Sequence, residues 1–580
     1  MKRTLLTAAV LLLAGASVSV VRGAQGAGTT QATPPAQTQA QPQGRRGGPP
    51  PTPEQIAENE RRARLRGEYS RYRANNDLLY YHLDVRIDPA KKLVTGKNTI
   101  RFKMLGDDTR IQLDLYANLN IDRIVQGTTE LKYSRDANTV YVDFPSTLKS
   151  GSVQSIDFFY SGTPTQTGRF GGFVFGEDPA GRDWIYTACE GEGAAIWWPN
   201  KDQWHDEVEN MDLSVAIPSA LTDASNGRFV RKTDLGDGFT RWDWKINYPI
   251  NNYNVSVNIA TYQHWQEKVG DVTMDFYVLP EDVERAKPQY AQAKGMMEAF
   301  EHFFGEYPFV KDGYKLIHVP YSGMEHQSAV TYGNGFQNGY GGGNRDWTGV
   351  GISLKFDFIV VHESGHEWFG NAVSAADASD MWIQEGWCTY LEGLYVEHVY
   401  GLADALTYLN GYKPKIQNQT PIVRERGLHR SPSGNDQYFK GALMLNTLRS
   451  VVNDDKKWMK LLRDTYDTFK YKNSMTEDMV AFFNKQTGMN LTPIFNQYLR
   501  HTAIPVLDLE FDAAAGTVRY RWKVDEPGFT MPVRVGAPVG SEDAWQTITP
   551  TTEWQTMKTT RSKESFMVQT NRYFVNVNKS

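Results

Sequence analysis

The chain has 580 residues, of which 40% are hydrophobic and 22% charged, and its formal net charge is −5 at pH 7. This composition is that of an ordinary soluble globular protein and excludes a chain that is disordered or membrane-embedded throughout. The length exceeds what one hydrophobic core supports, so we expect about three domains. No long block of Lys and Arg could follow a phosphate backbone, so no nucleic-acid partner is expected.

The N-terminal segment has the features of a secretory signal peptide. Lys2 and Arg3 precede an apolar run from Leu5 to Leu13, and small residues follow that run. An uncleaved membrane anchor would need about 20 apolar residues, and polar residues interrupt this stretch. We therefore predict a signal peptide over residues 1–24 and a secreted or periplasmic protein that keeps no stable membrane insertion.

Residues 25–74 are predicted to be a disordered Pro/Gln/Gly-rich spacer with a lead-in to the first domain. The first half of this segment cannot bury enough apolar surface to fold on its own. The charged stretch from Glu54 to Arg73 favours a short helix before the first folded domain.

The rest of the chain is predicted to be multidomain α+β. Two-residue alternation, as in Val140 to Phe144, predicts an N-terminal β domain over residues 75–265. Residues 266–502 change to helical spacing and predict a mainly helical domain, and alternation after Pro505 predicts a small β-sandwich-like domain over residues 503–580. The expected helices cover residues 284–304, 356–369, 382–400, 438–452 and 476–486, the last starting at a capping box of Ser474 and Glu477.

A metal-binding pattern lies inside one of these helices. His362 and His366, in the sequence H-E-S-G-H, lie on one helix face, where both rings can point a nitrogen at one zinc ion. The intervening Glu363 is offset and can reach a bound water instead. Taken alone, the pattern is also compatible with a buried helix that carries two hydrogen-bonded His.

The next predicted helix strengthens the metal interpretation. Glu385 begins a segment that can run antiparallel to the first helix, which would return a carboxylate to the ion. Two His and one Glu leave a fourth position open, which is the catalytic arrangement of zinc. We therefore predict that His362, His366 and Glu385 bind one zinc ion and that Glu363 is the catalytic base.

The pattern H-E-x-x-H, eighteen residues, then Glu in W-x-x-E-G resembles the gluzincin aminopeptidases, relatives of aminopeptidase N and of leukotriene hydrolase. Residues 81–85 look like the start of the family's first β domain, and residues 305–309 look like the start of its catalytic domain. The resemblance implies that residues 266–502 form a thermolysin-like zinc peptidase domain. It also implies an aminopeptidase, which removes the first residue of peptides with a free N-terminus.

The family's G-A-M-E-N strand resembles S-G-M-E-H at residues 322–326. The resemblance implies that Glu325 holds the substrate's ammonium group and that Gly323 and Met324 lie along the bound peptide. Ser replaces the first Gly of the motif and His326 replaces its Asn. The sequence therefore does not decide which contacts this strand makes along the peptide backbone.

The family's T-Q-x-E motif resembles T-A-C-E at residues 187–190. The resemblance implies that Glu190 is a second carboxylate for the substrate's ammonium. Glu192 lies two residues further along and could face the same way on a strand. Ala188 replaces the family's Gln, which predicts a roomier pocket for the first side chain of the substrate.

The family's Y-x-K-G motif resembles residues 438–441, which implies that Tyr438 donates a hydrogen bond to the developing oxyanion. Glu392 also fits the family pattern, and we interpret it as a residue that supports the metal ligands. Cys189 and Cys388 are the only cysteines, and two separate buried thiols are favoured over one disulfide.

Two other functions are compatible with this sequence. The zinc site could serve an endopeptidase or an epoxide hydrolase, but two carboxylates at the amine position disfavour this reading. A non-catalytic peptide-binding scaffold would not need Glu363 and Tyr438. Many relatives have a large helical C-terminal domain over the active site, and no such domain follows the last β domain here, so we expect a more open site. The oligomeric state and the preferred side chain are open.

Overall fold

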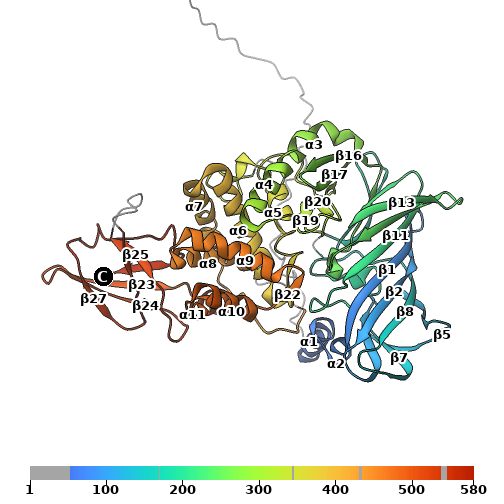
Figure 1. The fold of residues 1–580 in the computed structure, drawn as a ribbon, viewed down its shortest axis with the longest axis horizontal. Helices are drawn as coiled ribbons and strands as arrows, with labels where there is room; N and C mark the ends of the chain where they lie inside the picture. Colours follow the sequence, from blue (N-terminus) through green and yellow to red (C-terminus); the bar gives the residue numbers. More distant parts are fainter. Residues whose placement is uncertain (1–51, 169, 343–344, 430–433, 537–544) are drawn as a thin grey trace, which may run out of the picture. The chain divides into compact units, whose positions relative to one another are not determined.

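The computed structural model describes residues 52–168, 170–342, 345–429, 434–536 and 545–580. The predicted signal peptide and most of the predicted spacer lie outside these ranges. The chain divides into residues 1–55 and a compact unit of residues 56–580, which contains all the sheets. In Figure 1 the sequence colours of this unit pass from blue and green strands through yellow and orange helices to red strands.

The charged lead-in forms two helices, α1 (Pro53–Gly67) and α2 (Arg71–Ala74). No residue of α1 is buried, and hydrogen bonds attach this helix to the domains. The backbone N–H of His429 donates to the Ala63 carbonyl at 3.0 Å, and the Arg66 guanidinium donates to the Gly191 carbonyl at 3.3 Å. The lead-in is therefore hydrogen-bonded to the loop that contains Glu190 and to the segment that contains His429.

The N-terminal domain is built from three sheets around one core. Alternate residues of β1 are buried, among them Tyr81, Leu83 and Val85, as two-residue periodicity requires for a half-buried strand. The eight-stranded sheet has the order β13 (Arg228–Asp234), β14 (Phe239–Ile246), β11 (Asn210–Pro218), β1 (Asn76–Asp88), β2 (Leu93–Met104), β8 (Val153–Gly162), β4 (Asn120–Gln126) and β5 (Thr129–Glu130).

Of the two smaller sheets of this domain, the four-stranded one contains the strand that leads to Glu190. Their orders are β12 (Thr222–Ser225), β15 (Val257–Ala260), β10 (Asp183–Ala188), β9 (Gly172–Glu177), and β3 (Asp108–Asp114), β7 (Thr139–Leu148), β6 (Lys132–Asp136). Strand β10 ends at Ala188, so Glu190 lies in the loop just beyond it. The short 3-10 helix η2 (Asn252–Asn254) precedes β15.

The central domain contains a five-stranded sheet that the helical pattern of its sequence did not predict. Its order is β16 (Gln263–Val269), β17 (Val272–Val278), β18 (Tyr314–His318), β20 (Val330–Tyr332) and β19 (Gly323–Met324). Strands β18 and β20 are buried along their whole length, so they show no alternation. Strand β19 pairs antiparallel with β20, with Met324 opposite Thr331, which places Glu325 at the end of β19.

Helices make up most of this domain, as predicted. They are α3 (Val283–Tyr290), α4 (Gln292–Phe304), α5 (Phe358–Gly365), α6 (Trp382–Tyr400), α7 (Leu402–Asn410), α8 (Asp436–Val452), α9 (Asp455–Phe469), α10 (Thr476–Thr487) and α11 (Thr492–Arg500). A two-stranded sheet joins β21 (Val373–Ala375) to β22 (Lys472–Ser474). In the described part of the chain, none of the helices has both the length and the apolar character that a membrane crossing requires.

The predicted capping box of α10 is wrong in its residues. Ser474 belongs to β22, the N-cap is Met475, and Asp478 accepts the Met475 N–H at 2.9 Å. The Glu477 carboxylate instead forms ion pairs with Arg426 and Arg500. The helix begins one residue later than a box from Ser474 to Glu477 requires, so Asp478 lies at N3 and its carboxylate accepts the N-cap N–H.

The C-terminal domain is made of two sheets, and Val518 and Trp522 are buried in it. The orders are β27 (Gln555–Lys558), β24 (Thr517–Lys523), β23 (Val506–Asp512), β29 (Asn576–Lys579), and β26 (Gln546–Ile548), β25 (Val533–Gly536), β28 (Met567–Val568). The order of a β-rich domain, a mainly helical domain and a second β domain confirms the predicted fold class.

Candidate active site

Helices α5 and α6 bring three ligand atoms together, which we call the metal end of the site: His362, His366 and Glu385. The carboxylate Oε2 of Glu385 lies 3.6 Å from His362 Nε2 and 3.3 Å from His366 Nε2. All three side chains are buried, and this Oε2 atom has no hydrogen-bond partner. An orphaned buried carboxylate oxygen between two imidazole nitrogens fits a divalent cation, and the set of two nitrogens and one oxygen suits zinc.

The other ring nitrogen of each His is already occupied. His362 Nδ1 lies 2.7 Å from Glu392 Oε1, and His366 Nδ1 lies 3.0 Å from the Phe369 carbonyl oxygen. Each Nδ1 therefore carries the proton in the neutral ring, and each Nε2 presents its lone pair to the metal end. Tyr408 donates to Glu392 Oε2 at 2.7 Å, and Tyr412 donates to the same atom.

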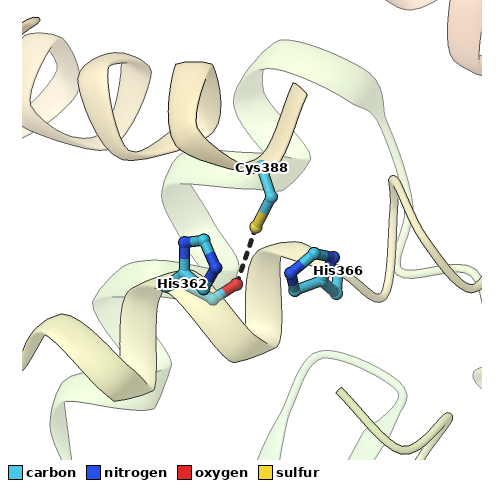
Figure 2. A group of neighbouring side chains, drawn as sticks. All are labelled: His362, His366 and Cys388. Carbon is cyan, nitrogen blue, oxygen red and sulfur yellow. Dashed lines mark hydrogen bonds between the residues drawn. The ribbon is translucent and has the colours of Figure 1, made fainter. Parts of the chain in front are cut away.

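Cys388 is a further sulfur ligand candidate beside the two His, and Figure 2 shows it between them. The ligand atoms of His362, His366 and Cys388 lie within 4.8 Å of one another. The Cys388 thiol donates a hydrogen bond to the His362 carbonyl at 2.8 Å. The sulfur therefore keeps its proton, whereas a metal-binding Cys is a thiolate. The unpartnered oxygen of Glu385 is the better third ligand. Cys189 and Cys388 are both free and buried, as the sequence favoured.

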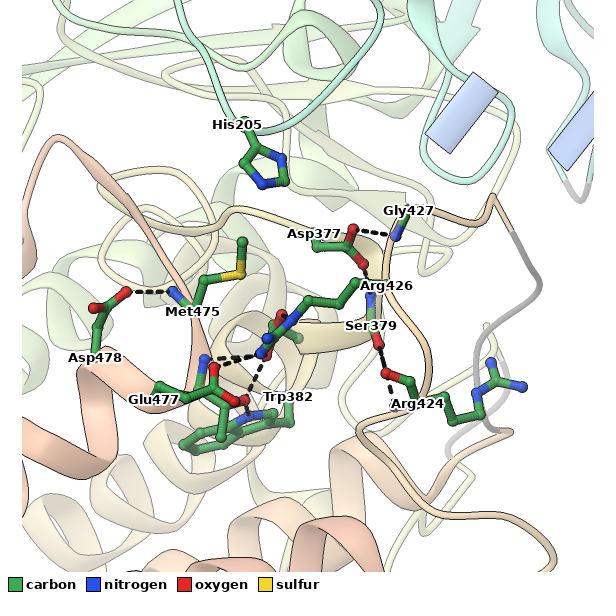
Figure 3. Close-up of polar contacts among 12 residues, drawn as sticks. His205, Asp377, Ser379, Trp382, Arg424, Arg426, Gly427, Met475, Glu477 and Asp478 are labelled. Atoms are coloured by element: carbon green, nitrogen blue, oxygen red, sulfur yellow. Dashed lines mark hydrogen bonds and ion pairs between the residues drawn. The ribbon is translucent and has the colours of Figure 1, made fainter. Parts of the chain in front are cut away.

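The start of α6 is fixed by a polar network, which Figure 3 shows. The buried carboxylate of Asp380 accepts two hydrogen bonds from Arg426, at 2.7 and 2.8 Å. The Trp382 indole donates to Thr476 Oγ1 at 2.8 Å, and that hydroxyl donates to Asp380 in turn. These contacts fix the first turn of α6, in which Glu385 lies, before any ion is bound.

Glu363 is buried beside the metal end and faces β19. Burial is the largest cause that raises the pKa of Glu363 to about 7. A Cβ atom on Gly323 would lie 2.7 Å from Ile359 and 2.9 Å from Glu363 Cγ. Glycine at 323 therefore lets β19 approach α5 closely, which brings this strand next to the Glu363 side chain.

We call Glu325 and Glu190 the amine end of the site, after the role that the sequence predicts for them. Acceptor atoms of Glu325, Glu363 and His366 lie within 4.8 Å of one another, so the two ends are adjacent. Burial raises the pKa of Glu325, and the charge of Glu385 adds to that effect. Burial also raises the pKa of Glu190 well above its usual range, with repulsion from Glu325 as the next cause. The charge of Glu325 thus acts on the Glu190 carboxyl.

Tyr438 lies in the first turn of α8, half-buried at the metal end. Its ring stacks on the His362 ring with centroids 6.2 Å apart. Burial raises the pKa of Tyr438 well above its usual range, and the charge of the Glu385 carboxylate adds to this. The phenol therefore keeps its proton and can donate it in a hydrogen bond.

A small apolar cluster borders the amine end. Ala188 and Met324 are buried in it with Val319 and Tyr321. The Tyr321 ring lies 5.1 Å from the Phe170 ring and 5.3 Å from the Tyr186 ring. We call this set, Phe170, Tyr186, Ala188, Val319, Tyr321 and Met324, the aromatic pocket wall, after the substrate pocket that the sequence predicts beside Ala188.

Sequence reasoning missed several buried polar residues around Glu325. The Tyr253 hydroxyl donates to Glu325 Oε1 at 3.0 Å, and Asn371 Nδ2 donates to the Glu325 carbonyl at 2.7 Å. Neither residue lies in a recognised motif. His326 is fully buried, neither of its ring nitrogens has a hydrogen-bond partner, and burial lowers its pKa to about 3.

Two imidazoles on one helix, a carboxylate on the next and a glutamate between the imidazoles define the H-E-x-x-H class of metallohydrolase sites. The comparisons with known proteins agree with this class. Residues 289–498 match the family model described as "Peptidase family M1 domain", and residues 78–253 match "Peptidase M1 N-terminal domain". These two ranges together span more than half of the chain, which belongs to peptidase family M1. The predicted family resemblance is confirmed.

Named relatives are distant in sequence. A leucyl aminopeptidase of Saccharolobus solfataricus is 21% identical over 428 residues, which are 70% of this chain and 51% of the relative. Probable aminopeptidase 2 of Sulfurisphaera tokodaii is 22% identical over 44% of this chain and 34% of the relative. This chain thus spans a third to a half of the length of these two relatives.

The fold is also similar to that of solved structures. The crystal structure of an M1 zinc metallopeptidase from Deinococcus radiodurans has a TM-score of 0.62 and 19% sequence identity. The match covers 74% of this chain and 95% of that chain. At this identity the similarity supports the fold, and the chemistry rests on the residues of this chain.

Proposed function

We propose that this protein is a zinc-dependent aminopeptidase that hydrolyses the first peptide bond of substrates with a free N-terminus. One observation carries this proposal. The Glu325 carboxyl lies next to the metal end, with a ligand atom within 4.8 Å of one of His366, and its charge raises the pKa of the Glu190 carboxyl. A substrate ammonium placed between them would relieve their repulsion and would put the first peptide bond at the metal end. The aminopeptidase names of the relatives support the same function.

The residues have distinct roles in this reaction. A zinc ion bound by His362, His366 and Glu385 would polarise the scissile carbonyl and make water a better nucleophile. Glu363 takes a proton from the attacking water and later delivers it to the departing amine.

The Tyr438 phenol supports the same step from the other side of the carbonyl. It donates a hydrogen bond to the carbonyl oxygen as negative charge develops there. It does this as a neutral donor, because the raised pKa of Tyr438 keeps the phenol protonated.

The decisive experiment compares paired substrates. We expect the purified protein to release a fluorophore from aminoacyl substrates, to lose this activity with a chelator and to regain it with zinc. The matched N-acetylated substrates should be cleaved at least about 100-fold more slowly, because an amide cannot form the ion pairs of an ammonium. Efficient cleavage of the acetylated series would instead support an endopeptidase.

The aromatic pocket wall supports a preference for large apolar first residues. Phe170, Tyr186 and Tyr321 offer ring faces beside Ala188, whose methyl group leaves room for a substrate side chain. A panel of aminoacyl substrates tests this, and a preference for Asp or Glu over Phe would contradict it.

The N-terminal segment supports export of the protein. Lys2, Arg3 and the apolar run after them are typical of a signal peptide, so the working site would be the periplasm or the exterior. N-terminal sequencing of the mature protein from cell fractions tests this. An intact Met1 in a cytosolic fraction would contradict export.

A further inference from the structure

Tyr253 occupies a position at the amine end that no sequence motif marks. It lies on η2 in the N-terminal domain and is 1% exposed. Its hydroxyl contacts Glu325 from the central sheet and Gln384 from α6. One phenol oxygen therefore joins three segments that are far apart in sequence.

The hydrogen bonds through this hydroxyl have a direction. Gln384 Nε2 donates to the Tyr253 oxygen at 2.9 Å, and an amide NH₂ group has no lone pair with which to accept a proton. The phenolic proton is therefore directed to Glu325 Oε1, at 3.0 Å. One carboxylate oxygen of Glu325 is held in this way, which fixes the orientation of the whole group.

The neighbouring residue on η2 holds the main chain of Glu325. Asn254 Nδ2 donates to Asn371 Oδ1 at 2.9 Å, and Asn371 Nδ2 donates to the Glu325 carbonyl at 2.7 Å. All these groups are buried, so each bond is protected from competition by water. Two consecutive residues of η2 thus fix both the side chain and the backbone of Glu325.

Gln384 connects the Tyr253 hydroxyl to the helix that contains the metal-end residue Glu385. It directly precedes Glu385 on α6, and its side chain is 2% exposed. The distance between the ammonium-binding carboxylate and the metal ligand is therefore set through Tyr253 and Gln384. That distance decides which peptide bond of a bound substrate reaches the metal end.

We propose that Tyr253 is a positioning residue for amine recognition, which orients Glu325 toward the substrate's ammonium and, through Gln384, sets its position relative to Glu385. This inference rests on the proposed function and deepens it. It predicts that loss of the hydroxyl weakens recognition of the free amine more than it slows the chemical step.

The test replaces Tyr253 with Phe in the zinc-loaded full-length protein. We expect KM for a phenylalanyl fluorogenic substrate to rise about tenfold, with kcat changed less than threefold, because one charge-assisted hydrogen bond is lost. Calorimetry in a Glu363→Gln background, which should not hydrolyse this ligand, should show a similar rise in Kd for L-phenylalanine amide. The Kd of the N-acetylated amide should not change, because it has no ammonium for Glu325.

Tyr262→Phe is the matched control. The Tyr262 hydroxyl is also buried, donates to the His318 carbonyl at 2.8 Å and accepts from the Trp184 indole at 3.0 Å. This variant should keep the wild-type KM and Kd. An equal loss in both variants, or an unchanged KM and Kd in Tyr253→Phe, would overturn the role of Tyr253.

A second variant keeps the inference testable if Tyr253→Phe folds poorly. Gln384→Met removes the donor that directs the phenolic proton, and should raise the Kd of the free amide two- to fivefold at unchanged zinc content. An unchanged Kd would count against the direction of the hydrogen bonds. Wild-type protein without turnover would refute the proposed function, whereas the Kd comparison would still decide on Tyr253.

Discussion

The metal end and the amine end of the active site differ in how their charges are balanced. At the metal end, burial alone would raise the pKa of Glu385, yet the adjacent His366 and His362 hold it well below its usual range. At the amine end, burial raises the pKa values of Glu325 and Glu190, and the two carboxyl groups repel each other.

This difference follows from the hydrogen bonds at each end. Glu392 and the Phe369 carbonyl occupy the outer nitrogens of His362 and His366, so the metal ligands are oriented by the protein. At the amine end, Tyr253 satisfies one oxygen of Glu325, but no basic side chain forms an ion pair with Glu325 or Glu190 among the described residues. A buried site with excess negative charge is complementary to a cationic ligand.

The largest expected effect is a loss of turnover in a variant that keeps the residues of both the metal end and the amine end. Glu363→Gln should lower kcat about 1000-fold, because the amide cannot accept the proton of the attacking water. Zinc content, measured by mass spectrometry, should equal that of the wild type. Glu298→Gln, an exposed change on α4, is the control. Wild-type turnover in Glu363→Gln would exclude the assigned base.

The next effect concerns the metal end alone. Glu392→Gln should weaken zinc binding about 10- to 100-fold, because His362 loses a charged hydrogen-bond partner. Competition with a chelating dye measures this affinity, and saturating zinc should restore most of the turnover. Glu397→Gln, on the same helix but paired with Arg449, should leave the affinity unchanged. Equal zinc affinity in Glu392→Gln and the wild type would contradict the role of Glu392.

The pH dependence of ligand binding sharpens the comparison at the amine end. The ammonium group binds ionised carboxylates, so affinity for L-phenylalanine amide should be full above the raised pKa values of Glu325 and Glu190. It should fall as pH drops through them, by up to about tenfold per pH unit.

Calorimetry at saturating zinc in a Glu363→Gln background, which should not hydrolyse the ligand, measures this titration, and Glu325→Gln should flatten it. Above about pH 8 the ligand itself loses its proton and binding should weaken again. An affinity that increases toward acidic pH would contradict a carboxylate amine site.

The smallest expected effect concerns the aromatic pocket wall. Ala188→Gln should lower kcat/KM for phenylalanyl substrates about tenfold relative to alanyl substrates, because the longer side chain fills space beside Tyr321. Ala180→Gln is exposed and should not change this ratio. An unchanged preference in Ala188→Gln would remove Ala188 from the pocket.

The two ends also differ in how far the sequence predicts them. His362 and His366 could be found because a helix brings residues four apart to the same face, and Glu385 because it begins the next helix. Glu325 and Glu190 could be predicted only from the resemblance to the family's motifs. No spacing rule relates the end of a strand to a loop in another domain.

The misses have the same physical origin. Strands β18 and β20 of the central sheet were not predicted because they are buried along their whole length, so their residues do not alternate between buried and exposed. Glu477 was assigned to a capping box, but Arg426 and Arg500 compete for its carboxylate from distant segments. Contacts between segments that are remote in sequence leave no local signal.

The sequence by itself indicated the three residues of the metal end, the glutamate between the two imidazoles and the order of β-rich and helical regions, because helix and strand periodicity are local properties of the chain. Only the tertiary structure decided which groups support that chemistry. Tyr253 and Gln384 meet across 131 residues, and Asn371 reaches Glu325 across 46 residues. A hydrogen bond requires its atoms to lie about 3 Å apart, and only the folded chain sets that distance between residues so far apart in sequence.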